Sequence, residues 1–215
     1  MDSTALEIKP YTGWRAVLRP AVLDRIEQVA VALLFVWLVQ RVWVSGNPFA
    51  PLLLVAEFSV LVFVLIRRPT EAISVRLGDW LLAITATCAP LLIQPEVDLW
   101  PQIAALGVGL VLLGNCGQIW AKLFLRRSFG IAPANRGVKK DGPYRFVRHP
   151  MYAGYLIAHI GVMVLMPSLF NLTVYIVGWW AQILRLKAEE DLLRQDPAYA
   201  EYMGQVRWRL IPGVF

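Results

Sequence analysis

The fold of this chain is decided by its longest apolar run, which reads PQIAALGVGLVLLGNCGQIWAKLFL over residues 101–125. As a helix, a run of about 20 apolar residues crosses the hydrocarbon core of a bilayer. The rest of the chain has a similar character, because 58% of its 215 residues are hydrophobic and only 17% are charged. A water-soluble domain usually carries more charge, so we expect the bilayer to be its solvent.

Five further apolar runs are also expected to be membrane helices. They are residues 26–44, 49–66, 75–93, 151–166 and 169–184. Unpaired strands are too costly in lipid and no alternating strand pattern occurs, so the sequence predicts an all-α, polytopic bundle of about six transmembrane helices. The last two runs are short and are joined only by PSL, which predicts a tight C-terminal helical hairpin that turns at Pro167.

Lys and Arg residues predict the orientation of the bundle, because cytoplasmic loops are enriched in them. They occur in or beside alternate loops and at both ends: Lys9, Arg15, Arg19, Arg25, Arg67, Arg68, Arg76, Arg126, Arg127, Arg136, Lys139, Lys140, Arg145, Arg148, Arg194, Arg207 and Arg209. The loops SGNP, QPEVD and PSL have none. We therefore expect a multi-pass membrane protein with both termini and the 126–150 loop in the cytoplasm, and with Glu96 on the opposite side. Because these charges flank apolar runs, the net charge of +6 predicts lipid headgroups, and not nucleic acid, as the partner.

The loop before the fifth run contains a dense group of polar and aromatic residues, DGPYRFVRHPMYAGY, residues 141–155. Pro150 suits the first turn of the following helix. His149 then lies at the helix N-terminus, where unpaired N–H groups favour an anion such as a carboxylate. The group is typical either of a charged ligand site or of a basic, aromatic belt at the membrane interface.

A second polar cluster, RLKAEEDLL, residues 185–193, follows the last apolar run. Arg185 and Glu189 are four residues apart and share a helical face. The predicted hairpin returns them to the membrane side of His149, so a ligand with a carboxylate, an amine and a cation fits between the two clusters. The alternative is an ion pair between Arg185 and Glu189 that ends a helix.

Several polar residues lie inside the apolar runs. Glu57 is a candidate functional residue, because ionisable groups in a span are costly, although an interhelical hydrogen bond is the alternative. His159 is expected to be structural. Cys88 and Cys116 have no metal-ligand spacing, so we expect buried free thiols and no metal site. The sequence also lacks GxGxxG after a strand, GxxxxGK[ST], HExxH and GxSxG, which argues against a Rossmann cofactor domain.

The segment GPYRFVRHPMYAGY, followed by the hairpin, a pair of glutamates and AYAEYMGQVRWRLIP, resembles the isoprenylcysteine carboxyl methyltransferase family and its relatives among the phospholipid N-methyltransferases. The likeness covers roughly residues 105–215. It implies an integral-membrane enzyme with N-terminal membrane helices in residues 1–100 and a methyltransferase catalytic region in residues 101–215. It also implies that S-adenosylmethionine binds in a cytoplasmic pocket without a Rossmann fold.

The resemblance implies a set of site residues. The cofactor contacts fall on Arg136, Gly137, Val138, Lys139, Tyr144, His149, Pro150, Met151, Tyr152 and Glu189. Arg185 corresponds to the family's substrate-orienting arginine, and we expect it to hold a carboxylate through its planar fork. An amine acceptor would need a proton acceptor, for which Glu190 is the candidate.

The leading hypothesis is therefore methyl transfer from S-adenosylmethionine to a lipidic or prenylated acceptor that enters from the bilayer, with a carboxylate of the isoprenylcysteine type as the reacting group. Alternatives are a phospholipid amine N-methyltransferase, a membrane NADPH-dependent sterol-type reductase, and a non-catalytic scaffold or transporter. The reductase would have to bind three phosphates, whereas the scaffold would bind no nucleotide.

Overall fold

The computed structural model describes residues 20–70, 72–95 and 101–215. Within these ranges the chain is all-helical, and its only β-type pairing is an isolated bridge between Ile73 and Ala134. The helices are α1 (Pro20–Ser45), α2 (Pro51–Ile66), α3 (Leu77–Cys88), η2 (Ala89–Leu92), α4 (Pro101–Leu125), η3 (Arg126–Ser128), η4 (Gly142–Arg145), α5 (Pro150–Leu165), α6 (Leu169–Leu193) and α7 (Pro197–Gln205). The all-α prediction is confirmed for the described residues. The predictions for Lys9, Arg15, Arg19 and Glu96 fall outside them.

Each predicted apolar run is a helix, with one important difference at α6. The sequence predicts a short helix that ends at Leu184, but α6 continues to Leu193 and is 25 residues long. Charged side chains end an apolar run without ending a helix, because Arg, Lys, Glu and Leu all favour helical backbone. The extension carries Arg185, Glu189 and Glu190 on a rigid helix beyond the last apolar turn.

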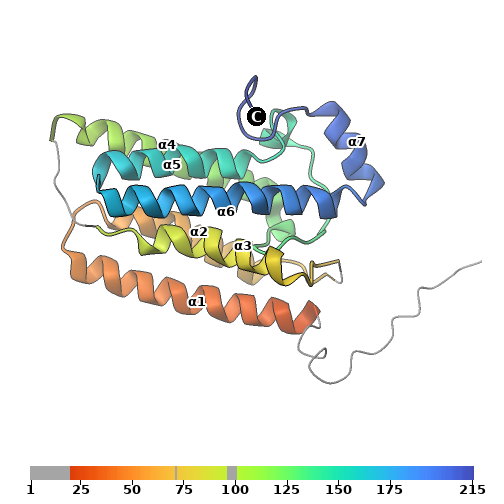
Figure 1. The fold of residues 1–215 in the computed structure, drawn as a ribbon, viewed down its shortest axis with the longest axis horizontal. Helices are drawn as coiled ribbons and strands as arrows, with labels where there is room; N and C mark the ends of the chain where they lie inside the picture. The colour runs from red at the N-terminus through yellow and green to blue at the C-terminus, as the bar shows by residue number, and fades with distance from the viewer. Residues whose placement is uncertain (1–19, 71, 96–100) are drawn as a thin grey trace, which may run out of the picture.

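The six long helices alternate in direction, so connections between them gather at two ends of the bundle (Figure 1). The start of α1, the α2–α3 connection, the α4–α5 loop and α7 lie together at one end, and these segments carry most of the Lys and Arg residues. At the other end, Arg41 donates hydrogen bonds to the carbonyl oxygens of Leu91 and Ile93. The charge asymmetry read from the sequence therefore corresponds to two physical ends of the molecule.

The outer surface of the bundle is strongly apolar. Large hydrophobic side chains are exposed on the long helices, and Trp43 at 87% and Val44 at 83% are the most exposed of them. A soluble monomer rarely exposes so much apolar surface, which fits contact with lipid. By length and composition alone, one helix in the described ranges is able to cross a membrane, Gln102–Ser128. The six-span topology stays a prediction.

The two cysteines are free, as expected. The expectation that both are buried is wrong for Cys116, which is exposed on α4, whereas Cys88 is partly buried. In a membrane helix an apolar thiol can face lipid as well as the protein interior, so its position in an apolar run does not predict burial.

Helices α4 and α5 touch through their backbones at glycines. A Cβ atom at Gly114 would lie 2.4 Å from the backbone nitrogen of Ala158 and 2.6 Å from the carbonyl oxygen of Gly154. Two turns after Gly154 on α5, a Cβ atom at Gly161 would lie 2.7 Å from the carbonyl oxygen of Gly107. Glycines seven residues apart on both helices thus permit a close approach of the kind common between membrane helices. This contact fixes α5, and with it the 141–155 motif, against α4.

A buried ionic network connects α1 to the end of α2 and to the α4–α5 loop. Arg67 pairs with Glu27 and with Asp24, the latter at 2.8 Å. Arg136 pairs with the same oxygen of Asp24 at 2.9 Å, and the backbone N–H of Ile131 donates to Glu27 at 3.0 Å. Because these buried contacts join α1 to both a side chain and the backbone of the loop, the network holds the loop against the N-terminal helices.

Candidate active site

The 141–155 motif has the local structure that the sequence predicts. Pro150 is the first residue of α5, and His149 is its N-cap. The preceding η4 turn begins at Gly142, whose φ of +60° is in the left-handed region and whose Cα faces the ring of Phe124. The tail then pairs with the motif, since the N–H groups of Arg148 and His149 donate to the carbonyl oxygens of residues 208 and 209 at 2.9 and 2.8 Å. The start of α5 is therefore held by the η4 turn that precedes it and by the C-terminal tail.

Glu190 is the centre of a cluster of positive and polar groups. Its side chain is 1% exposed, and its oxygens lie 3.0 Å from Arg148, 3.1 Å from His149 and 2.9 Å from Arg209. Burial alone would raise the pKa of Glu190, but the hydrogen bond and charge of His149, the hydrogen bond from Arg209 and the charge of Arg148 lower it below its ordinary value. Glu190 is thus ionised and already paired, an arrangement that positions the motif and the tail.

Tyr152 connects the two polar clusters predicted from the sequence. Its hydroxyl donates to Glu189 at 2.8 Å, and its ring is stacked on His149 with centroids 5.5 Å apart. The guanidinium of Arg185 lies 5.5 Å from the centre of the same ring. Among the described residues no ion pair joins Arg185 to Glu189, so the predicted alternative of a simple helix-ending pair does not describe this geometry. Both residues instead contact Tyr152.

A pocket opens beside Tyr152 at the basic end of the bundle. It is lined by Leu125, Ser128, Ala134, Arg136, Gly137, Val138, Lys139, Tyr144, Arg148, His149, Met151, Tyr152, Glu189, Leu193, Tyr199 and Tyr202. Its empty space is about 570 Å³ when the open mouth is included. Nine of the ten residues expected to contact the cofactor line it, and Pro150 does not. Among these nine, Arg136 uses its guanidinium to pair with Asp24.

The chemistry of this lining fits S-adenosylmethionine. Tyr152 uses one oxygen of Glu189, and a carboxylate accepts several hydrogen bonds, so Glu189 can also receive an ammonium group. The α5 N-terminus favours a carboxylate. Tyr199 has a buried hydroxyl that finds no partner within the described part of the chain, and burial raises its pKa above the ordinary range, so it remains a donor. Apolar and aromatic residues at the same pocket, such as Leu125 and Tyr202, suit an adenine ring.

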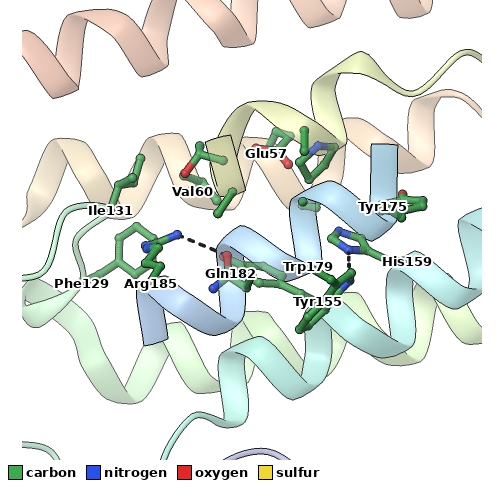
Figure 2. Close-up of a pocket in the computed structure, with 16 residues that line it drawn as sticks. Glu57, Val60, Phe129, Ile131, Tyr155, His159, Tyr175, Trp179, Gln182 and Arg185 are labelled. Atoms are coloured by element: carbon green, nitrogen blue, oxygen red, sulfur yellow. Dashed lines mark hydrogen bonds between the residues drawn. The ribbon is translucent and has the colours of Figure 1, made fainter. Parts of the chain in front are cut away.

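A second pocket lies deeper, among α2, α3, α5 and α6, with an empty space of about 620 Å³ (Figure 2). Most of its lining is apolar or aromatic, but Glu57, His159, Gln182 and Arg185 also reach it. Figure 2 shows Arg185 near Phe129 at one end and His159 near Tyr175 at the other. Since Arg185 also contacts Tyr152, this arginine stands at the boundary between the two pockets.

Two sequence expectations for intramembrane residues have different outcomes. His159 accepts a hydrogen bond from the indole N–H of Trp179 at 3.1 Å, which agrees with the expected structural role. Glu57 does not make the interhelical hydrogen bond considered for it, because no hydrogen bond or ion pair of the described residues involves its carboxylate, and it lines the deep pocket. Asn115 and Gln118, by contrast, bond to each other at 2.8 Å.

Sequence reasoning missed Lys122, Tyr199 and Tyr202. Lys122 is fully buried in α4, where its ammonium donates to Ser59 and Gln118 at 2.7 and 2.6 Å and lies 4.9 Å from the ring centre of Tyr155. The signal that identified Glu57, an ionisable group in an apolar run, also applies to Lys122. The two tyrosines come from α7, which no apolar run marks.

Two comparisons with known proteins each match part of this chain. Residues 103–199 match the model of the phospholipid methyltransferase family. The cobalt-zinc-cadmium resistance protein CzcN of Cupriavidus metallidurans is 27% identical over 133 residues, which are 59% of this chain and 59% of that protein. The chain therefore spans about three fifths of the length of this relative. The matched segment includes nearly all of α4, the whole of α5 and α6, and Tyr152, Arg185 and Glu189, so this part of the chain is similar to the phospholipid methyltransferase family.

Proposed function

We propose that this protein is a membrane methyltransferase that transfers a methyl group from S-adenosylmethionine to a lipidic acceptor. The observation that carries the proposal is the position of Tyr152, which contacts Glu189 in the open pocket and Arg185 at the entrance to the deep apolar pocket. One pocket has the polar lining that suits the cofactor, and the other has the apolar walls that suit a lipid chain. The reacting ends of the two ligands then meet beside Tyr152.

The residues of the chain act by binding and orientation. Glu189 holds the amino group of the cofactor, and the α5 N-terminus with His149 holds its carboxylate. When bound, the cofactor supplies an electrophilic methyl group on its sulfonium. Arg185 orients the acceptor, and a fixed alignment of this kind lowers the barrier by about 7–11 kcal/mol relative to reaction between freely diffusing partners.

We propose a carboxylate of the isoprenylcysteine type as the reacting group. A carboxylate needs no general base, which agrees with the paired, ionised state of Glu190. Arg185 is 4% exposed and its guanidinium Nε is without a partner in the described residues, so it retains a donor for such a group. In this proposal Glu190 acts at the site by positioning His149 and Arg209.

A phospholipid amine is the second candidate, and the description of the matched family favours it. Its amine would have to lose a proton before attack, and Glu190 is a poor proton acceptor because its pKa is lowered. A reductase is less favoured by the electrostatics of the open pocket. Three Arg and Lys side chains line the open pocket. Arg136 and Arg148 are already paired with Asp24 and Glu190, which leaves only Lys139 to bind the phosphates of NADPH.

The proposal predicts that substitutions of Glu189 and Arg185 fail in different ways. Glu189→Gln is expected to weaken binding of S-adenosylhomocysteine about tenfold or more, because a charge-assisted hydrogen bond to its ammonium group is lost. Arg185→Lys is expected to leave that affinity within about twofold and to lower methyl transfer about 100-fold, since an ammonium cannot reproduce the planar fork. Calorimetry measures the first, and transfer of radiolabelled methyl groups to extracted lipids measures the second.

Lys187→Gln is the matched control on the same helix, because Lys187 is exposed and lines neither pocket. It is expected to change neither quantity. Unchanged affinity in Glu189→Gln would remove the cofactor assignment. Full turnover in Arg185→Lys with every labelled lipid would remove the acceptor assignment.

We further propose that the basic end of the bundle, which contains the open pocket, faces the cytoplasm. In a cysteine-free background, Arg207→Cys is then expected to react with a membrane-impermeant maleimide only after the cells are opened, whereas Pro48→Cys reacts in intact cells. Both positions are exposed; Pro48 is in the α1–α2 connection and Arg207 follows α7, and these two segments lie at opposite ends of the bundle (Figure 1). Labelling of both positions from the same side would contradict the six-span topology.

A further inference from the structure

One face of α6 presents three polar side chains to the deep pocket, and each leaves a buried polar atom unpaired. Tyr175, Gln182 and Arg185 are 6, 7 and 4% exposed. The hydroxyl of Tyr175, the amide Nε2 of Gln182 and the Nε of Arg185 have no hydrogen-bond partner within the described residues. Buried polar groups are almost always paired in native proteins, so these atoms indicate a ligand with polar groups of its own.

Glu57 adds a carboxylate to the same pocket from α2. Lys122 of α4 is a buried cation whose ammonium already donates to Ser59 and Gln118 at 2.7 and 2.6 Å. No described hydrogen bond or ion pair uses Glu57, although it is one of the residues that line the pocket. Glu57 and Tyr175 also line a smaller adjoining cavity, so the two residues share one part of the pocket wall. An acceptor group and a hydroxyl therefore lie in the same part of an otherwise apolar space.

The unpaired groups are distributed along the length of the pocket. Tyr175 precedes Arg185 by ten residues on one helix, which corresponds to about 15 Å at 1.5 Å per residue, and Tyr175 precedes Gln182 by about 10 Å. Figure 2 shows Arg185 and Tyr175 at the two ends, with Gln182 between them. A purely apolar chain in this pocket would leave the groups at the far end unpaired, at a cost in binding.

We propose that the lipidic acceptor carries a hydroxyl group on its apolar chain, about 10–15 Å from the group that Arg185 holds. The hydroxyl donates to the carboxylate of Glu57 and accepts from the hydroxyl of Tyr175, and one oxygen atom can make both bonds. This inference rests on the proposed function in one respect, that the deep pocket holds the acceptor. It narrows the acceptor class from any lipid chain to an oxygenated one.

A matched pair of probes tests the inference directly. In 12-hydroxystearate the hydroxyl is about 13 Å from the carboxylate at roughly 1.2 Å per bond of an extended chain, and stearate lacks only this hydroxyl. Binding of the tritiated probes to the full chain in lipid nanodiscs is expected to favour the hydroxylated probe about tenfold. Glu57→Leu and Tyr175→Phe are each expected to reduce the preference to about twofold or less while leaving the affinity for stearate unchanged.

Tyr155→Phe is the matched control, because it removes the same atom from another tyrosine of the pocket whose hydroxyl is not among the unpaired buried atoms. It is expected to retain the preference. Each variant must bind S-adenosylhomocysteine as the parent does, which shows that it is folded. Equal binding of both probes to the parent, no binding of either, or an unchanged preference in both Glu57→Leu and Tyr175→Phe overturns the inference. Loss of methyl transfer in Arg185→Lys is a separate result and bears only on the proposed function.

Discussion

Gly114→Ala is expected to lower the free energy of unfolding by about 3 kcal/mol, the upper part of the range for overpacking a well-packed site. The added methyl group would lie 2.4 Å from the backbone nitrogen of Ala158 and 2.6 Å from the carbonyl oxygen of Gly154. Both atoms are backbone, so no side chain can rotate away, and α4 and α5 must separate. The better helix propensity of alanine offsets only about 1 kcal/mol of this cost. Thermal unfolding in detergent, followed by circular dichroism, measures the change.

Gly109→Ala is the matched control for this effect. Gly109 is on the same helix, is exposed, and has no atom within 4 Å of the position that a Cβ would take. The same substitution there is expected to stabilise the protein by up to about 1 kcal/mol, because only the propensity gain remains. Opposite signs at the two positions would establish the close backbone contact between α4 and α5. A melting temperature for Gly114→Ala at or above that of the parent would exclude it.

Glu190→Gln is expected to be the most damaging single change near the proposed site, with a loss of about 3–5 kcal/mol of stability. An amide cannot neutralise the two arginines that lie 3.0 and 2.9 Å from the buried carboxylate. The charge pairing between the tail and the α5 N-terminus is then lost, while the backbone hydrogen bonds between them remain. Asp191→Asn is the neighbouring control, since Asp191 is 67% exposed and its pair with Arg194 is 3.7 Å long. It is expected to change stability by less than about 0.5 kcal/mol.

The same cluster gives the stability a defined dependence on pH. The pKa of Glu190 is lower in the folded protein than its ordinary value of 4.5, so the unfolded chain takes up this proton first as the pH falls. The contribution of Glu190 is therefore complete above pH 4.5 and is lost as the pH falls below 4.5 toward the lower, folded-state pKa. Unfolding curves for the parent and for Glu190→Gln should converge at acidic pH. A constant difference between pH 7 and the acid limit would contradict this assignment.

The sequence predicts the helices well, because length and hydropathy are local properties of a run. It fails at the end of α6, where the charged sequence from Arg185 onward continues the helix after the hydropathy signal stops. It also gives no reason to expect α7, whose nine residues have no apolar run and are a helix because Asp196 caps them and the tyrosines pack inward.

The sequence predicts which residues line the candidate pocket, but not which of them contact one another. The family pattern identifies nine residues that do line one pocket, because the pattern follows the order of the chain. Tyr152 contacts both Arg185 and Glu189 because of the way α5 lies against α6. The position of α5 depends in turn on its close contact with α4 at the glycines. Pairing across helices of this kind has no signature in the spacing of one helix. The same reason explains why the unpaired atoms of the deep pocket were not expected.

The ionic network around Asp24 limits how the chain can be divided or recombined. Asp24 and Glu27 on α1 hold Arg136 and the N–H of Ile131, both in the loop that borders the open pocket. A hybrid protein that joined residues 101–215 to the N-terminal helices of another protein would have to bring equivalent carboxylates, or Arg136 would be a buried cation without a counter-ion. Exchange of the N-terminal helices can thus change the lining of the deep pocket only when these two acidic residues are transferred with them.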